Sequence, residues 1–164
     1  MKVPAEISEA ITAQARDLAR AAVVAVSGVG SFGVEMFLTA NGELAINELA
    51  PRVHNSGHYT IEACDCSQFE NHVRAVLGWP LANPLMLTPV AVMVNLLGTE
   101  KASGEPRGLE NVLRLTGARV HIYGKLMSGA GRKMGHVTVL GNSLEDAQAI
   151  AERAAKEISF GEKL

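Results

Sequence analysis

The stretch GVEMFLTANGELAINELAPRVHNSGH, residues 33–58, decides the fold of this chain. Hydrophobic residues alternate with other side chains at 34–38, which predicts a strand, and the pattern returns at 44–48. Between them, Asn41-Gly42 is a strong signal for a tight hairpin turn. The sequence therefore predicts an antiparallel hairpin that leads into a loop rich in polar groups.

Two acidic residues stand on opposite arms of this predicted hairpin, Glu35 and Glu48. Residues whose numbers sum to about 83 face each other across the turn, so the two carboxylates become cross-strand neighbours with Cβ atoms roughly 5 Å apart. Like charges this close are destabilising unless they are neutralised, and Mg²⁺ takes oxygen ligands from one or two carboxylates together with substrate phosphates. Asn47 and Asn55 offer further oxygens. The alternative is a pair of solvated carboxylates on an exposed strand face.

The loop that follows, Pro51–His58, concentrates a guanidinium, two imidazoles, an amide and a hydroxyl. Arg52 can hold phosphate or carboxylate oxygens through two parallel hydrogen bonds. Gly57 would let the backbone approach a ligand closely or open the next helix. The alternative is a polar loop that only caps a helix, with Asn55 or Ser56 as the cap.

Three sequence patterns could indicate a zinc site or a dinucleotide-binding site, but the residues around them argue against these sites. His54 and His58 have the spacing of zinc ligands on a helix, but the glycine between them argues against one helix through both. Cys64 and Cys66 have no further soft ligands nearby and are interpreted as reduced structural thiols. GVGSFG at 28–33 follows a predicted helix and precedes a strand, the reverse of the dinucleotide-binding order.

Composition excludes some classes of partner. The chain has 164 residues, of which 48% are hydrophobic and 20% charged, and this predicts a packed core. Its net charge of -2 gives no general attraction to nucleic acid or to an anionic membrane. No apolar run approaches the ~20 residues needed to span a bilayer, and the start of the chain has no signal-peptide apolar region. We therefore expect neither a nucleic-acid nor a membrane partner.

Three prolines within residues 80–89 indicate a boundary. We expect a first domain at 1–80, a linker at 81–88 and a second domain at 89–164. Helices are expected at 5–26, 58–65, 67–77, 109–116 and 143–158, and further strands at 89–97, 119–124 and 133–140.

A second basic cluster lies in the second predicted domain. Lys125 follows a predicted strand, and the small residues SGAG lead into Arg132, Lys133 and His136. Small residues combined with cations suit a compact phosphate monoester. A solvated hairpin turn explains the same pattern equally well.

Taken together, these stretches resemble the N5-carboxyaminoimidazole ribonucleotide synthetase family, the ATPase subunit of phosphoribosylaminoimidazole carboxylase, within the ATP-grasp superfamily. NELAPR suits several ATP-grasp enzymes, whereas PRVHNSGH followed by YGK and GRKMGH points to this family. The resemblance covers about residues 3–158. It implies an α+β fold: the C-terminal half of an ATP-grasp domain, an antiparallel sheet with helices, followed by a small C-terminal α/β subdomain that binds the substrate phosphate.

The resemblance implies a nucleotide and metal site on the hairpin. Glu35 and Glu48 would bind the Mg²⁺ ions that bridge the phosphates of ATP, with Asn47 contributing to the same cofactor site. Asn55 would support the metal and phosphate site, and Arg52 would stabilise the acyl-phosphate chemistry.

The resemblance also implies the substrate contacts. His54, Asn55 and Ser56 would lie beside the reacting bicarbonate and amine, with His54 and Asn55 counted among the catalytic residues. Lys125 and Arg132 would hold the phosphate of the ribonucleotide.

In such enzymes ATP phosphorylates bicarbonate, and carboxyphosphate or its CO₂ carboxylates 5-aminoimidazole ribonucleotide. The products are N5-carboxyaminoimidazole ribonucleotide, ADP and phosphate, in purine biosynthesis. The resemblance further implies a cytoplasmic enzyme that is a homodimer in its full-length form. The glycine-rich phosphate loop and the adenine-binding hinge of the family are absent from this sequence, so we expect the isolated chain neither to hold ATP tightly nor to turn over.

Two alternatives remain. One is a related ATP-grasp ligase, such as formate-dependent glycinamide ribonucleotide transformylase or a biotin-carboxylase-like protein. The other is a non-catalytic module for binding or dimerisation that docks on a partner chain through an uncovered apolar sheet edge.

Overall fold

The computed structural model describes residues 1–161, and they divide into two units. The hairpin unit is Ala5–Met86, and the sheet unit joins Met1–Pro4 to the segment that begins at Leu87. The change of unit falls within the proline-rich segment that was expected as a linker. The sequence analysis placed Met1–Pro4 in the first domain. They belong to the sheet unit instead, because the strand that they form pairs with a strand of that unit.

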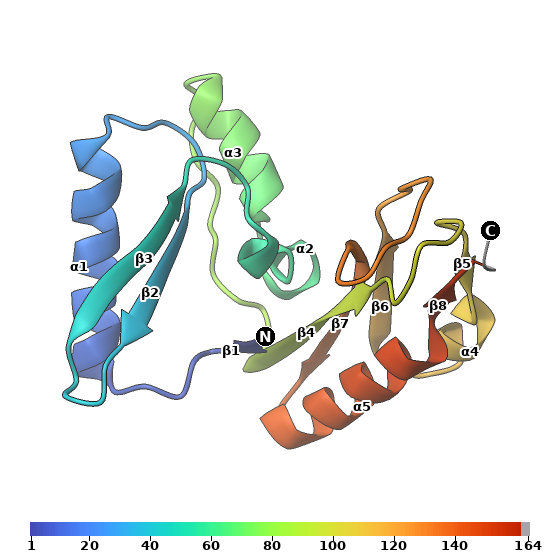
Figure 1. Ribbon diagram of the computed structural model, residues 1–164. Helices are drawn as coiled ribbons and strands as arrows, with labels where there is room; N and C mark the ends of the chain where they lie inside the picture. Colours follow the sequence, from blue (N-terminus) through green and yellow to red (C-terminus); the bar gives the residue numbers. More distant parts are fainter. Residues whose placement is uncertain (162–164) are drawn as a thin grey trace. The chain divides into compact units, whose positions relative to one another are not determined.

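The hairpin unit contains one long helix, one hairpin, a 3-10 turn and two shorter helices. Figure 1 shows the hairpin beside the long helix. Its elements are α1 (Glu9–Ala25), β2 (Gly33–Leu38), β3 (Leu44–Ala50), the 3-10 turn η1 (Asn55–Gly57), α2 (Thr60–Ala63) and α3 (Gln68–Val76). The Ser8 hydroxyl caps α1 by accepting a hydrogen bond from the backbone N–H of Ile11, and Glu9 adds a negative charge in the first turn. The helix expected at 5–26 therefore forms between these capping signals and the glycines that follow.

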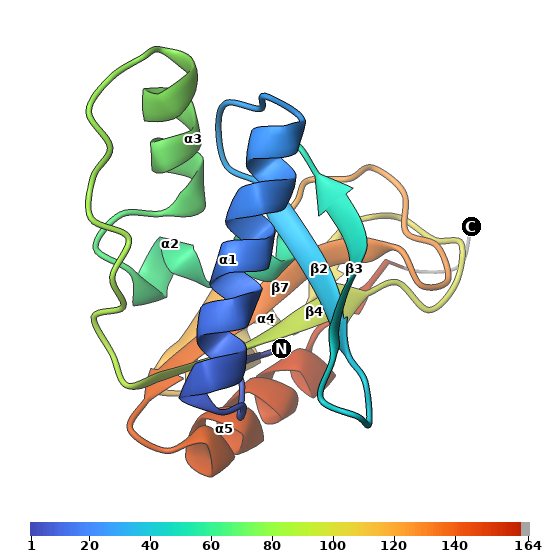
Figure 2. The same ribbon diagram turned by 90° about the vertical axis from the view of Figure 1, so that its left-hand side faces the viewer.

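Strands β2 and β3 form an antiparallel hairpin with one apolar face. That face is built from three cross-strand pairs: Val34 with Leu49, Met36 with Ile46, and Leu38 with Leu44. Val34 lines a groove of about 360 Å³ together with α1 residues that include Ala19 and Val23. Figure 2 shows α1 running along this hairpin. The apolar face thus packs toward α1, and the alternate residues of each strand point to the opposite face.

The sheet unit is an antiparallel sheet with a helix across it (Figure 1). Its elements are β1 (Lys2–Val3), β4 (Val90–Leu97), β5 (Pro106–Arg107), α4 (Leu109–Leu113), β6 (Ala118–Ile122), β7 (Lys133–Gly141), α5 (Leu144–Glu157) and β8 (Ser159–Phe160). Four strands lie in the order β1-β4-β7-β6, and β5 pairs with β8 as a separate two-stranded ladder. The sequence analysis predicted β4, β6 and β7 but missed β1, β5 and β8, which are each two residues long.

The hydrophobic core of the sheet unit lies between α5 and the strands β4 and β7. The helix presents three buried alanines, Ala147, Ala151 and Ala154, at helical spacing. Such small side chains allow the helix to approach the sheet closely. They pack with large core residues of the strands, including Val92 and Val137.

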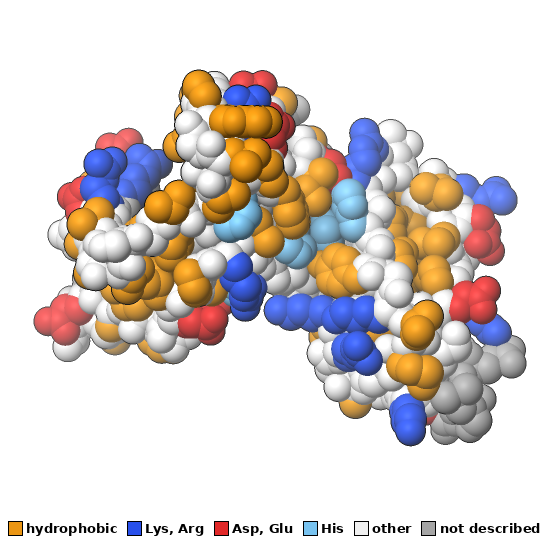
Figure 3. All heavy atoms as spheres, turned by 90° about the horizontal axis from the view of Figure 1, so that it is seen from above, with side chains coloured by type: hydrophobic (Ala, Val, Ile, Leu, Met, Phe, Trp, Pro, Cys, Tyr) orange, Lys and Arg blue, Asp and Glu red, His pale blue; other side chains and the backbone are white. Residues whose placement is uncertain are grey.

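The described residues thus form an α+β fold, as predicted, and their strands pair antiparallel in both units. None of the described helices combines the length and the apolar character needed to cross a membrane. Figure 3 shows hydrophobic side chains, in orange, at the surface of both units.

Candidate functional site

The acidic pair lies on the face of the hairpin that points away from α1. Glu35 and Glu48 are direct partners across β2 and β3, which confirms the predicted pairing of these two residues. The register then shifts, because Met36 pairs with Ile46 and leaves Asn47 without a partner in the ladder. A bulge of this kind sets two residues of one strand opposite one residue of the other and redirects their side chains.

The bulged residue joins the acidic pair directly. Asn47 Nδ2 donates a hydrogen bond to Glu35 Oε2 over 3.3 Å. Because facing residues of an antiparallel pair project to the same side, Glu35, Asn47 and Glu48 gather oxygen-bearing side chains on one face. Oxygen donors of this kind are the ligands that Mg²⁺ prefers, so the residues present fit a magnesium site.

The polar loop after β3 folds back onto this face. His54 Nε2 lies 3.5 Å from Glu35 Oε1, with the histidine side chain 14% exposed and the glutamate side chain 43% exposed. The contact depends on Gly33 at the start of β2, because a Cβ atom there would lie 2.6 Å from His54 Cβ. Glu35 therefore faces Asn47 through one carboxylate oxygen and His54 through the other.

The remaining predicted residues of the loop surround His54. Ser56 approaches its ring twice: the backbone N–H donates to Nδ1 over 3.3 Å, and the hydroxyl oxygen lies 2.8 Å from Nδ1. Arg52 is exposed, and its Nη1 donates to the carbonyl of Val53 over 3.1 Å. Asn55 is half-buried at the first position of η1.

Two residues of α3 that the sequence analysis did not select contact this region: Gln68 holds the polar loop, and His72 holds the segment that leads into β2. Gln68, the first residue of α3, is hydrogen bonded to His54 and His58, and His72 Nδ1 accepts from the backbone N–H of Ser31. Their only sequence signal is a polar side chain on a helix, which is common. His54 has an extended backbone and precedes η1, so His54 and His58 do not share a helix.

Three ionisable groups next to this region are held in their neutral forms by burial. Burial raises the pKa of Cys64, and the neighbouring Cys66 raises it further. Burial and the carboxylate of Glu70 raise the pKa of Cys66, and burial followed by Cys64 raises the pKa of Tyr59. Both cysteines are free and buried, in agreement with their interpretation as structural thiols.

The two predicted phosphate-binding residues belong to the sheet unit and lie between β6 and β7. Lys125 Nζ donates to the carbonyl of Lys133 over 2.6 Å and lies 5.8 Å from the centroid of the Tyr123 ring. Arg132 is exposed, and its backbone carbonyl accepts from the N–H of Gly98. Both cations therefore flank one glycine-containing loop.

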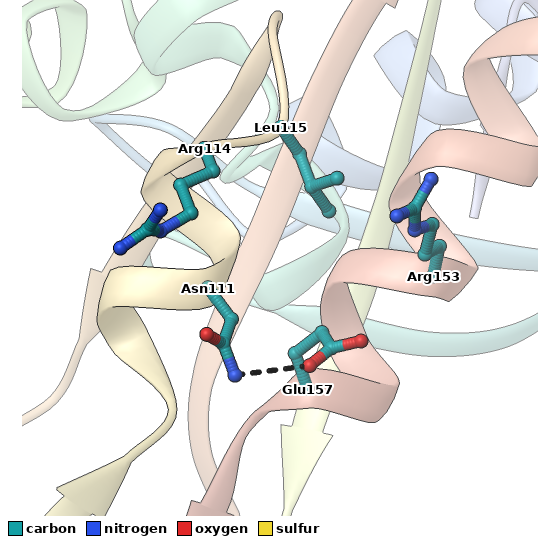
Figure 4. Close-up of a pocket in the computed structure, with 5 residues that line it drawn as sticks. All are labelled: Asn111, Arg114, Leu115, Arg153 and Glu157. Atoms are coloured by element: carbon teal, nitrogen blue, oxygen red, sulfur yellow. Dashed lines mark hydrogen bonds between the residues drawn. The ribbon is translucent and has the colours of Figure 1, made fainter.

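The sheet unit also has a polar pocket that no sequence pattern indicated (Figure 4). It measures about 380 Å³ and lies between α4 and α5, with Asn111, Arg114, Leu115, Arg153 and Glu157 in its lining. Asn111 Nδ2 donates to Glu157 Oε2 over 3.2 Å, which ties the two helices together. Figure 4 shows Arg114 pointing away from this pair. Since Arg114 follows the last residue of α4, its charge complements the end of that helix.

Comparison with known families defines the class of the protein. The ATP-grasp domain family matches residues 1–69, which include the acidic hairpin and the polar loop. The family described as "Phosphoribosylaminoimidazole carboxylase C-terminal domain" matches residues 91–150 of the sheet unit. The chain therefore belongs to the ATP-grasp proteins.

The particular family follows from individual relatives. The chain is 49% identical over 138 residues to N5-carboxyaminoimidazole ribonucleotide synthase of Bacillus subtilis, covering 84% of this chain and 35% of the relative. It is 45% identical over 149 residues to phosphoribosylaminoimidazole carboxylase of Ogataea methanolica, covering 88% and 27%. The chain belongs to the N5-carboxyaminoimidazole ribonucleotide synthetase family.

Solved structures agree with this assignment. The synthetase from Thermotoga maritima matches with a TM-score of 0.91 and 48% identity, over 99% of this chain and 45% of that one. The synthase from Aspergillus clavatus in complex with ADP and 5-aminoimidazole ribonucleotide matches with a TM-score of 0.82 and 37% identity, over 94% and 42%. The chain thus spans about a third or less of these two curated relatives and under half of the solved chains.

Proposed function

We propose that the chain carries the metal-binding and substrate-binding half of a site for ATP-dependent carboxylation. The substrates are 5-aminoimidazole ribonucleotide and bicarbonate, and the products are N5-carboxyaminoimidazole ribonucleotide, ADP and phosphate. The main support is the pairing of Glu35 with Glu48 on the hairpin face that carries Asn47 and His54. A relative named for this product, and the Aspergillus complex with ADP and the ribonucleotide, support the choice of substrates.

In this proposal, Glu35 and Glu48 hold Mg²⁺, with Asn47 beside them as a further oxygen donor. When bound, the metal supplies positive charge to the phosphate oxygens of ATP. Without it, two facing carboxylates repel each other. The polar face of the hairpin is thus the nucleotide cofactor site.

The residues of the loop act on the reacting groups. Arg52, whose guanidinium is exposed, binds oxygens of bicarbonate or of the transferring phosphoryl group. His54, Asn55 and Ser56 orient the bicarbonate and the substrate amine. The Ser56 contacts and the Glu35 contact hold the ring of His54 before any substrate arrives, so that little reorganisation is needed on binding.

Lys125 and Arg132 bind the phosphate of the ribonucleotide in the sheet unit. The ammonium group of Lys125 is held in place by its hydrogen bond to the carbonyl of Lys133. It has three N–H donors, so it can keep this bond and also bind a phosphate oxygen. We further propose that the complete enzyme is a cytoplasmic homodimer.

The metal half of the proposal can be tested with Mn²⁺ as a paramagnetic substitute for Mg²⁺. Addition of Mn²⁺ and ADP should broaden NMR signals of β2, β3 and residues 51–58 first. Glu35→Gln and Glu48→Gln should each remove this broadening, because each removes a charged ligand. Glu43→Gln is the matched control, an exposed residue in the turn between the same strands. Broadening that is centred elsewhere, or that survives both substitutions, contradicts the metal site.

The substrate half is tested by calorimetry with two ribonucleotides. The chain should bind 5-aminoimidazole ribonucleotide more tightly than glycinamide ribonucleotide, and Lys125→Met or Arg132→Met should weaken binding by roughly ten- to a hundredfold, since a hydrogen bond to a charged group contributes about 1.5–3 kcal/mol. Lys101→Met, another exposed cation of the sheet unit, should leave it unchanged. Tighter binding of glycinamide ribonucleotide supports the formate-dependent ligase instead.

A further inference from the structure

The side-chain amide of Gln68 makes three hydrogen bonds to the loop that carries the candidate catalytic residues. Its Oε1 accepts from the backbone N–H of His54 over 3.0 Å. Its Nε2 donates to the backbone carbonyl of His54 over 2.8 Å and lies 2.9 Å from Nδ1 of His58. One side chain of α3 therefore holds both the backbone of His54 and the ring of His58.

The contacts to the His54 backbone fix which way the Gln68 amide points. A backbone N–H can only donate and a carbonyl can only accept, so the opposite orientation would place two donors together and two acceptors together. Because Nε2 of Gln68 has donors only, Nδ1 of His58 must accept its hydrogen bond. The ring proton of a neutral His58 is then on Nε2.

The surroundings of Gln68 leave little room for another arrangement. A Cβ atom at position 57 would lie 2.4 Å from Gln68 Oε1, so Gly57 is needed for the amide to reach the loop. Thr60 Oγ1 accepts from the backbone N–H of Gln68 over 2.9 Å and donates to the carbonyl of Gly57 over 2.6 Å. The ring of His58 also packs against Phe69, with 5.2 Å between ring centroids.

We infer that Gln68 is a positioning residue of the site, which fixes His58 in the tautomer with Nε2–H and holds the backbone of His54 so that its ring stays against Glu35. This inference rests on the proposed function for its catalytic meaning.

The test is the tautomer of each histidine in the hairpin unit, read from long-range ¹H–¹⁵N NMR spectra of the chain. Spectra are recorded at alkaline pH, well above the usual imidazole pKa of about 6.5. His58 should show an unprotonated Nδ1 and a protonated Nε2. In Gln68→Glu the carboxylate has no proton to donate, so the proton of His58 should move to Nδ1.

His72 serves as the internal control, because its Nδ1 accepts from the backbone N–H of Ser31 and not from the Gln68 side chain. Its tautomer should stay unchanged in Gln68→Glu, and in Gln14→Glu, an exposed substitution on α1, both histidines should be unchanged. A protonated Nδ1 on His58 in the unsubstituted chain overturns the inference whether or not the variant folds. So does an unchanged His58 in a variant whose His72 signal is intact. Neither result depends on ATP or ribonucleotide binding, so the proposed function is tested separately.

Discussion

At the scale of single residues, the site depends on where side chains are missing as much as on where they are present. Gly33 lies in β2 two residues before Glu35, and the ring of His54 occupies the space that a side chain at position 33 would fill. Neither Gly33 nor Gly57 has a positive φ, so both are required for space and not for backbone freedom.

Gly33→Ala should therefore push the loop away from the hairpin. A methyl group 2.6 Å from His54 Cβ forces a shift of the loop, and overpacking of this kind reduces stability by about 1–3 kcal/mol. Urea denaturation followed by NMR signals of the hairpin unit would measure the loss. Gly129→Ala is the control, because its nearest neighbour would be Arg132 Cβ at 4.0 Å and its effect should stay within about 0.5 kcal/mol. Equal effects of the two substitutions would contradict this account.

At the scale of elements, the hairpin separates two tasks between its faces. The apolar pairs such as Met36 with Ile46 pack toward α1, and the alternate positions carry the acidic pair. An isolated two-stranded hairpin is marginally stable, so α1 must supply the packing that keeps the acidic face in register. Helix stability therefore contributes to site geometry, and caps are the local features that define where helices begin.

The cap of α5, in the sheet unit, allows the contribution of one capping hydrogen bond to stability to be measured. Ser143 accepts from the backbone N–H of Asp146 through its hydroxyl, at the start of a helix that packs on the core. Ser143→Ala should lower the free energy of unfolding of the sheet unit by about 1 kcal/mol. Ser143→Asp should retain most of it, because aspartate also caps and its charge suits a helix start. Thermal unfolding of the three proteins checks this order, and an alanine variant as stable as the aspartate variant would refute it.

At the scale of the whole molecule, the sheet unit is built from two segments of the chain, and the hairpin unit lies between them in the sequence. Residues Met1–Pro4 belong to the sheet unit, although α1 of the hairpin unit follows them directly. Strand β1 pairs Lys2 with Val92 and Val3 with Ala91, and it occupies the edge of the four-stranded sheet. The chain therefore contributes to the sheet unit from both sides of the hairpin unit.

Removal of Met1–Pro4 should weaken the sheet unit and leave α1 intact. The backbone N–H of Met93 donates to the carbonyl of Met1 over 2.9 Å, and the amino group of Met1 donates to the carbonyl of Met93. Without this pairing, hydrogen exchange at the Met93 amide should accelerate roughly five- to tenfold, for a loss of about 1 kcal/mol. Amides of α1 should keep their protection. Lys2→Ala, which preserves the backbone of β1, should leave Met93 unchanged, and faster exchange confined to α1 would contradict the prediction.

The sequence by itself determined the elements and the pairing that follow from local patterns. An alternating strand, the turn at Asn41-Gly42 and a second alternating strand are enough to predict the hairpin and to bring Glu35 and Glu48 near each other on facing strands, because a tight turn sets the register of its hairpin to within a residue. Capping residues and helical spacing likewise indicated α1 and α5, and Gly78 and Pro80 indicated the end of α3. The family resemblance rested on the same local stretches and agrees with the matched families.

Only the tertiary structure decided what depends on residues far apart in the chain. The bulge at Asn47, the contact of Gly33 with His54, the three hydrogen bonds of Gln68 and the pairing of β1 with β4 leave no periodic signal in the sequence. The physical reason is that periodicity reports which face of an element is buried, but not which remote atoms lie against that face. A single hydrogen bond or a missing Cβ atom can fix such a contact, and neither changes the pattern of hydrophobic residues along the chain.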